Sequence, residues 1–174
     1  MYSGVGASGF VGTALVNALT ARGHSVVGLD QHAPGPSLNA DTFIQADIRD
    51  RDALQKAFQG AEVVHHLAAL PSIARAPELD YWRVNVEGTR AALETAQNTG
   101  VAHFVHMSSS TVYGSPDHSP LRETAALAPR NPYSRTKAAA EEAVQLMALR
   151  GIPCTIIRPR VVVGNGRAGI FALL

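Results

Sequence analysis

The sequence predicts an α/β fold in which a doubly wound parallel sheet carries helices on both faces. Short apolar segments alternate with stretches of helical periodicity along the 174 residues. The apolar segments are nearly continuous rather than alternating, which is typical of strands buried on both faces of a parallel sheet. No internal repeat or low-complexity linker divides the chain, so residues 1–174 are expected to form a single domain.

The expected elements follow one another in a regular order. Strands are expected at residues 25–30, 42–47, 61–69, 101–109 and 152–159. A strand within residues 1–5 is expected to be short or frayed, because Gly4 weakens it. Helices are expected at residues 10–22, 50–59, 79–99 and 133–149, and Gly151 is a favourable end for the last. The proline-rich residues 32–37 and 113–132 predict loops.

Composition limits the classes of partner. Hydrophobic residues make up 46% and charged residues 17% of the chain, as in globular proteins. The net charge is +1 without a basic block, so neither nucleic acid nor a membrane surface is expected as a partner. The single cysteine, Cys154, excludes an intrachain disulfide framework. We see no signal peptide and no apolar run long enough for a bilayer, so a cytoplasmic location is expected.

The seven histidines do not predict a metal site. His65 and His66 are adjacent on an expected strand and therefore point to opposite faces. His103 and His106 are three apart on another strand and also face apart. No carboxylate or cysteine stands at ligand spacing beside them.

Three glycines mark the first loop. Gly6, Gly9 and Gly12 stand three apart where this loop becomes a helix, although glycine inside a helix costs about 0.5–1 kcal/mol relative to alanine. In a dinucleotide-binding turn, one glycine permits the tight turn, one admits the pyrophosphate and one lets the helix pack closely on the strand. The N–H groups at the helix N-terminus then face the phosphates.

An acidic residue extends this pattern. Asp30 follows Gly9 by 21 residues, at the end of the next expected strand, where a carboxylate binds the adenosine ribose hydroxyls. It would repel a 2′-phosphate, and no arginine stands immediately after it, so NAD is expected rather than NADP. Together the residues predict a Rossmann-type sheet. The alternative interpretation is a plain loop–helix turn with an incidental surface aspartate.

Seven segments then carry a family resemblance, in order along the chain. They are GASGFVG (6–12), ADIRD (46–50), VVHHLAA (63–69), NVEGTRAALETA (85–96), SSSTVYG (108–114), YSRTK (133–137) and RPRVVVGNG (158–166). In these segments the sequence resembles the extended short-chain dehydrogenases/reductases, in their epimerase/dehydratase branch. Each match alone is modest, but their order makes the combination specific.

The segment YSRTK carries the candidate chemistry. Tyr133 and Lys137 are four apart on an expected helix and so share one face. A nearby ammonium would favour the phenolate, and lowering a tyrosine pKa by three units requires about 4 kcal/mol. Tyr133 could then take a proton from a substrate hydroxyl while hydride leaves the same carbon. The alternative is an ordinary amphipathic helix with a solvated lysine.

The resemblance implies roles for further residues. Ser109 is implied as the third catalytic residue, which orients the substrate oxygen, while Ser108 and Ser110 fit a capping role. The residues implied to bind the cofactor are Gly6, Ser8, Gly9, Phe10, Val11, Gly12, Asp30, Asp47, Ile48, Leu67, Ala68, Ala69, Asn85, Tyr133 and Lys137. For Asn85 a purely structural role is the alternative.

The expected function is that of an NAD-dependent epimerase or dehydrogenase acting on a secondary alcohol, with a nucleotide sugar as the candidate substrate. Dehydration is disfavoured, because Ser110 and Thr111 stand where sugar dehydratases carry an Asp-Glu pair. A hydroxysteroid or aldehyde dehydrogenase-like reductase is one alternative. Another is an NAD-binding module without turnover, because the family's C-terminal substrate-binding part is not expected within residues 1–174. The sequence leaves the oligomeric state open, and a homodimer is one alternative.

Overall fold

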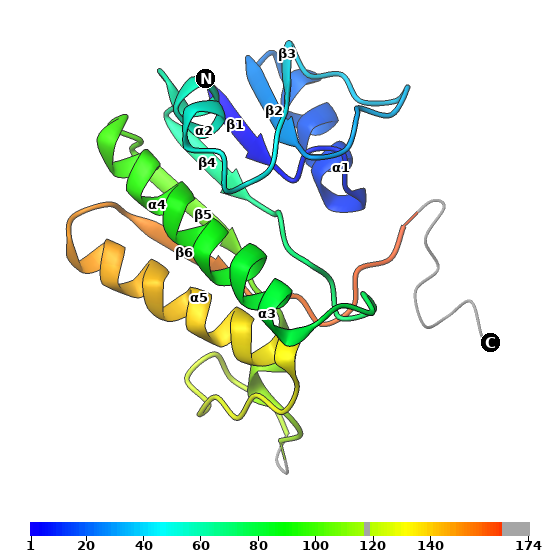
Figure 1. Ribbon diagram of the computed structural model, residues 1–174, viewed down its shortest axis with the longest axis vertical. Coiled ribbons are helices and arrows are strands. Elements are labelled where there is room, and N and C mark those ends of the chain that lie inside the picture. Colours follow the sequence, from blue (N-terminus) through cyan, green and yellow to red (C-terminus); the bar gives the residue numbers. More distant parts are fainter. Residues whose placement is uncertain (117–118, 165–174) are drawn as a thin grey trace.

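The computed structural model describes residues 1–116 and 119–164, which form a parallel sheet with helices on both faces (Figure 1). Its strands are β1 (Tyr2–Val5), β2 (Val26–Asp30), β3 (Thr42–Gln45), β4 (Val63–His66), β5 (His103–Met107) and β6 (Cys154–Ile157). The helices are α1 (Phe10–Thr20), α2 (Arg51–Phe58), α3 (Glu78–Tyr81), α4 (Gly88–Asn98) and α5 (Pro132–Leu149), with the π-helical segment η1 (Trp82–Glu87) and the 3₁₀ turn η2 (Ser110–Tyr113). The last two residues of the segment 158–166 lie outside the described residues.

The strand order is β3-β2-β1-β4-β5-β6, with every neighbouring pair parallel. The predicted Rossmann-type fold is therefore confirmed. The first strand is short, as expected, but it pairs with β2 on one side and β4 on the other. Residues Ser3 to Val5 are buried, so this central position holds the strand in place despite Gly4.

The two faces of the sheet are covered by different helices. The small core under α1 contains Ala7, Val16 and Val26. The larger core lies on the opposite face, where α2, α4 and α5 pack on the strands through residues such as Leu54 and Leu93. Figure 1 shows α4 and α5 side by side on that face. Residues alternate between the two cores along β2, which is why it is apolar from Val26 to Leu29, before Asp30 ends it.

The expected helix 79–99 is interrupted. Its first part is a single α-helical turn, α3, followed by the π-helical segment η1 and then α4. Such wide turns occur mostly inside α-helices and often near functional sites. The interruption places Asn85 inside η1, where its side chain is buried. Periodicity alone did not predict the change.

Among the helices of residues 1–116 and 119–164, none has the length and apolar character needed to cross a bilayer.

Candidate cofactor and active site

A cavity of about 730 Å³ opens at the carboxyl ends of β1, β2 and β4. This is where the strand order reverses, and open parallel sheets bind their ligands at such a point. Nine of the residues predicted to bind the cofactor line it: Gly6, Ser8, Gly9, Asp30, Asp47, Ile48, Leu67, Ala68 and Ala69. The sequence-based argument and the shape of the molecule thus indicate the same place.

Each of the three glycines meets a different constraint. Gly6 has φ of +86°, and a Cβ there would lie 2.7 Å from the backbone nitrogen of Ala68. A Cβ on Gly12 would lie 2.0 Å from the carbonyl oxygen of Gly6, so only glycine lets α1 pack against the turn. Gly9 is exposed, lines the cavity and would bring its Cβ no closer than 3.2 Å to that same oxygen. Gly9 is therefore the position at which a ligand can approach bare backbone.

Asp30 joins the end of β2 to the glycine turn. Its Oδ2 accepts a hydrogen bond from the backbone N–H of Ser8 at 3.0 Å. Its Oδ1 accepts one from the backbone N–H of His32 at 2.9 Å, and the His32 ring nitrogen Nδ1 lies 3.2 Å away. The carboxylate is thus held at the wall of the cavity, with acceptor capacity left for further donors.

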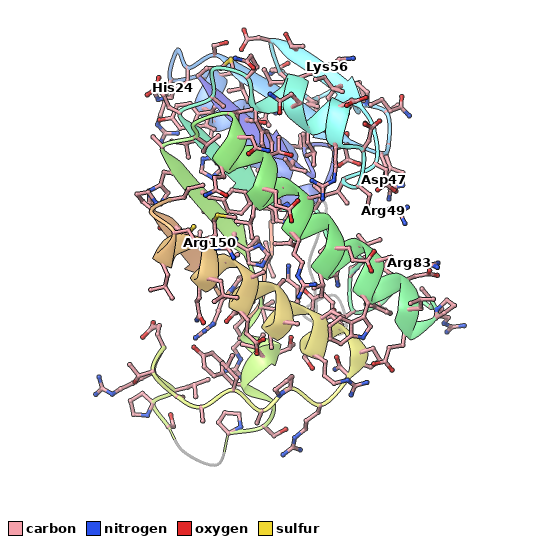
Figure 2. All side chains as sticks on the ribbon, turned by 60° about the vertical axis from the view of Figure 1, so that its left-hand side comes forward. His24, Asp47, Arg49, Lys56, Arg83 and Arg150 are labelled. Carbon is pink, nitrogen blue, oxygen red and sulfur yellow. The ribbon has the colours of Figure 1, made fainter. Side chains whose placement is uncertain are left out.

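Asp47 and Ile48 lie on the loop after β3. The Asp47 carboxylate forms a two-pronged ion pair with Arg49, with N–O distances of 2.7 and 2.8 Å. This pairing lowers the pKa of Asp47. Figure 2 shows both side chains at the edge of the molecule. The Ile48 side chain belongs to the core and would contact a Cβ at Gly88 at 2.7 Å, so Ile48 can meet a ligand mainly through its backbone.

The residues Tyr133 and Ser109 meet at the end of β5. Helix α5 begins with a capping box between Asn131 and Ser134, with Pro132 as its first residue, and this start places Tyr133 in the first turn. Ser109 is the second residue after β5 and the N-cap of η2, and its Oγ accepts a hydrogen bond from the Thr111 hydroxyl at 3.0 Å. The Ser109 side chain acts on the Tyr133 phenol and lowers its pKa, against the larger effect of burial.

Lys137 lies one turn along α5 and is buried. Its Nζ donates a hydrogen bond to the carbonyl oxygen of Met107, the last residue of β5. Desolvation lowers the pKa of Lys137 to about 8, while the nearby charge of Glu141 opposes this shift. The lysine therefore also ties α5 to the strand that leads to Ser109.

The structure does not show the expected lowering of the Tyr133 pKa. The pKa of Tyr133 is raised, because burial penalises the phenolate, and the nearby Tyr81 adds to the increase. The side chain of Ser109 lowers it only partly. Lys137 is directed to the Met107 carbonyl instead. The spacing of four residues puts the two side chains on one face but does not make them partners.

Asn85 has a structural role here. Its Oδ1 accepts a hydrogen bond from the N–H of Leu70 at 2.7 Å, and its Nδ2 donates to the Thr136 hydroxyl at 3.1 Å. It thereby joins the loop after β4, the helical segment η1 and α5. Asn85 does not line the cavity, and neither do Phe10, Val11, Gly12, Ser109, Tyr133 and Lys137. The Phe10 ring instead faces Gly164, where a Cβ would lie 2.8 Å from it.

Sequence reasoning missed several residues. Arg49, His32, Asp80 and Val84 line the cavity. The buried Glu141 forms an ion pair with the partly buried Arg158 beside the catalytic candidates, and the place of Glu141 one turn after Lys137 was a visible signal. Within the described part of the chain, no group of three or more His, Cys, Asp or Glu side chains is arranged to hold a metal ion.

Comparison with known proteins agrees with this geometry. The UDP-glucose 4-epimerase of Mycolicibacterium smegmatis is 38% identical over 188 aligned residues, covering 97% of this chain and 59% of the relative. The solved UDP-glucose-4-epimerase of Stenotrophomonas maltophila, with bound NAD and formylated UDP-arabinopyranose, is 33% identical with a TM-score of 0.83, over 90% of this chain and 52% of that one. The UDP-glucose 4-epimerase of Thermotoga maritima with UDP-glucose has a TM-score of 0.90 at 28% identity, over 99% and 60%.

The chain spans between 43% and 59% of the length of three curated relatives. Residues 5–172 match the sequence model of the NAD dependent epimerase/dehydratase family. The glycine turn, the cavity at the reversal of strand order and the residues gathered at the end of β5 occupy the matched region. The chain belongs to the NAD-dependent epimerase/dehydratase family.

Proposed function

We propose that this chain binds NAD(H) in the cavity and supplies Ser109, Tyr133 and Lys137 for hydride transfer at a secondary alcohol of a nucleotide sugar. The observation that carries the proposal is the placing of Ser109 beside Tyr133, whose pKa it lowers, with the buried Lys137 one turn away on α5. A hydroxyl, a phenol and an ammonium held at the end of one strand form the acid–base set that alcohol oxidation needs.

The chain's own residues have distinct parts in this chemistry. The glycine turn presents backbone N–H groups and the start of α1 to the pyrophosphate. Asp30 accepts hydrogen bonds from the adenosine ribose. Ser109 donates a hydrogen bond to the substrate oxygen, and Tyr133 takes the proton of the substrate hydroxyl. Bound NAD would supply the acceptor for the hydride that leaves the same carbon.

The raised pKa of Tyr133 requires assistance before the phenol can act as a base at neutral pH. Two positive charges can provide it: the Lys137 ammonium and the nicotinamide ring of bound NAD. Both favour the phenolate, which partly offsets the desolvation that opposes it. The proton transfer is therefore expected to depend on the cofactor being in place.

The nucleotide-sugar substrate rests on relatives. Solved members of the family hold UDP-glucose or formylated UDP-arabinopyranose. The segment after Ser109 carries hydroxyls and no carboxylate at Ser110 and Thr111, which favours epimerisation or oxidation over loss of water. A homodimer is also proposed, because α4 and α5 form a shallow groove beside the exposed Leu146 and Leu149.

The test combines binding and turnover. NAD(H) binding is measured by calorimetry on residues 1–174, and turnover is measured with UDP-glucose and its 4-epimer. Tyr133→Phe should abolish nearly all turnover and leave the NAD(H) affinity within about twofold. Tyr2→Phe, at the amino end of β1 and away from the cavity, should change neither. An epimerase returns the cofactor unchanged, whereas a dehydrogenase accumulates NADH.

Turnover retained in Tyr133→Phe would contradict its role as acid–base. NAD(H) binding without turnover in the unmodified chain would favour the alternative of a binding module, and failure to bind NAD(H) would contradict the proposal as a whole.

A further inference from the structure

Glu141 is a carboxylate buried in the interior of the protein. It lies on α5, and its side chain is 1% exposed. The Ser108 hydroxyl donates a hydrogen bond to its Oε1. The Arg158 guanidinium binds both oxygens, with Nε 3.0 Å from Oε1 and Nη2 2.7 Å from Oε2. A buried carboxylate is retained only with such partners, because its desolvation is costly.

The position of Glu141 links it to the proposed catalytic residues. Tyr133, Lys137 and Glu141 follow at intervals of four on α5 and so occupy one face of the helix. Ser108, its hydrogen-bond donor, directly precedes Ser109. Glu141 therefore touches the strand end that carries the serine and stands one turn from the lysine.

Glu141 is the nearby charge that opposes the loss of the Lys137 proton. The titratable groups that interact with Lys137 are Glu141 on α5, His66 on β4 and His106 on β5, and Arg158 after β6 lies behind Glu141. Burial and the Lys137 charge lower the pKa of His66 to about 3, so this imidazole is neutral at neutral pH. The pKa of His106 is also lowered, first by burial and then by the charges of Lys137 and His66. Glu141 is the anion of this group.

We propose that Glu141 is a positioning residue of the active site that supplies the buried negative charge keeping Lys137 an ammonium. The proposal rests on the function proposed above for Tyr133 and Lys137. Without this carboxylate, burial would drive Lys137 toward the neutral amine, and the positive charge that favours a Tyr133 phenolate would be lost. Arg158 holds Glu141 in place and also donates hydrogen bonds to the Tyr113 hydroxyl and the Glu123 carbonyl, which fixes the strand end from outside.

The chain offers a direct measurement, because Lys56 and Lys137 are its two lysines. Lys56 is exposed on α2, away from the site (Figure 2). In protein labelled with ¹³C at the lysine ε-carbon, the two signals can be titrated separately, and Lys56 is an internal reference. The unmodified chain should show a Lys137 midpoint near pH 8.

The decisive variant is Glu141→Gln, in which the Lys137 midpoint should fall by about one pH unit or more. A merely structural role predicts the opposite, since a loosened site admits water and raises the midpoint toward the ordinary lysine value. Glu141→Asp, which keeps the charge, should restore the midpoint. The matched control is Glu142→Gln, an exposed neighbour on the same helix, which should leave it unchanged.

Removing one partner of a buried pair can unfold a protein. If Glu141→Gln does not fold, the double variant Glu141→Gln/Arg158→Gln removes both charges of the ion pair, so Arg158 is not left without its carboxylate. The Lys137 midpoint should again fall, by less than in Glu141→Gln, because a positive charge is removed as well. An unchanged or raised midpoint in a folded variant would overturn the proposal. NAD(H) titration of the same samples separates the two hypotheses: an unmodified chain that fails to bind contradicts the proposed function, whereas the Lys137 midpoint alone decides the role of Glu141.

Discussion

The backbone N–H of Ser8 donates a hydrogen bond to the Asp30 carboxylate at 3.0 Å, across 22 residues of sequence. This contact joins the glycine turn after β1 to the end of β2, so the two parts of the cofactor-binding pattern form one wall of the cavity. A ligand that binds both at once must match a fixed separation between them. The pairing therefore explains how two local signals produce one site.

Asp30 should make the chain prefer NAD(H) over NADP(H). A carboxylate accepts hydrogen bonds from the ribose hydroxyls and repels a 2′-phosphate, and a hydrogen bond to a charged group is worth about 1.5–3 kcal/mol. The expected preference is about tenfold or more. Asp30→Ala should reduce it by weakening NAD(H) and improving NADP(H). Calorimetric titration of both cofactors measures this, with Asp52→Ala on the exposed start of α2 as a control. Equal affinities in the unmodified chain would refute the role of Asp30.

Gly9 and Gly12 should respond differently to alanine. In Gly12→Ala the new Cβ would lie 2.0 Å from the Gly6 carbonyl oxygen, and such overpacking costs about 1–3 kcal/mol or more of unfolding free energy. In Gly9→Ala the nearest atom lies 3.2 Å away, so the fold should persist while the methyl group obstructs the cofactor. Urea denaturation and NAD(H) titration separate the effects. A Gly9→Ala variant with unchanged affinity would exclude close approach of a ligand at this glycine.

Acid should destabilise the fold through its buried histidines. Burial lowers the pKa of His106 well below the ordinary 6.5, and neither of its ring nitrogens has a hydrogen-bond partner among the described residues. Below pH 6.5 the unfolded chain therefore binds protons that the folded chain does not. The unfolding free energy consequently decreases as the pH is lowered. The slope approaches about 1.4 kcal/mol per pH unit for each such histidine.

His106→Phe should reduce this slope, because it removes one of the groups responsible. The apolar ring would stand beside His66, whose ring centroid lies 5.3 Å from that of His106. The exposed His24, by contrast, should leave the slope unchanged when replaced by Gln (Figure 2). Urea denaturation between pH 7 and 4 provides the comparison. Equal slopes in the His106 variant and the unmodified chain would show that this histidine does not titrate as its burial requires.

The sequence alone determined those features that arise from neighbours in the chain. The order of strands and helices follows from alternating patterns, and Gly6 and Gly12 announce a turn because no other residue fits there. Eight of the residues that the family segments predicted to bind the cofactor, together with Asp30, line the cavity, since the carboxyl ends of parallel strands meet at one edge. The sequence also predicted helix α5, with Tyr133 and Lys137 four residues apart on one face.

The tertiary structure decided what depends on distant contacts and burial. Glu141 meets Ser108 across 33 residues and Arg158 across 17, and no local pattern specifies those partners. Burial raised the pKa of Tyr133, although spacing had suggested the reverse. Desolvation and charge pairing are properties of the assembled interior, where water is excluded and segments from several strands converge. A sequence names the groups that will be buried, but only the packed fold determines which of them face one another.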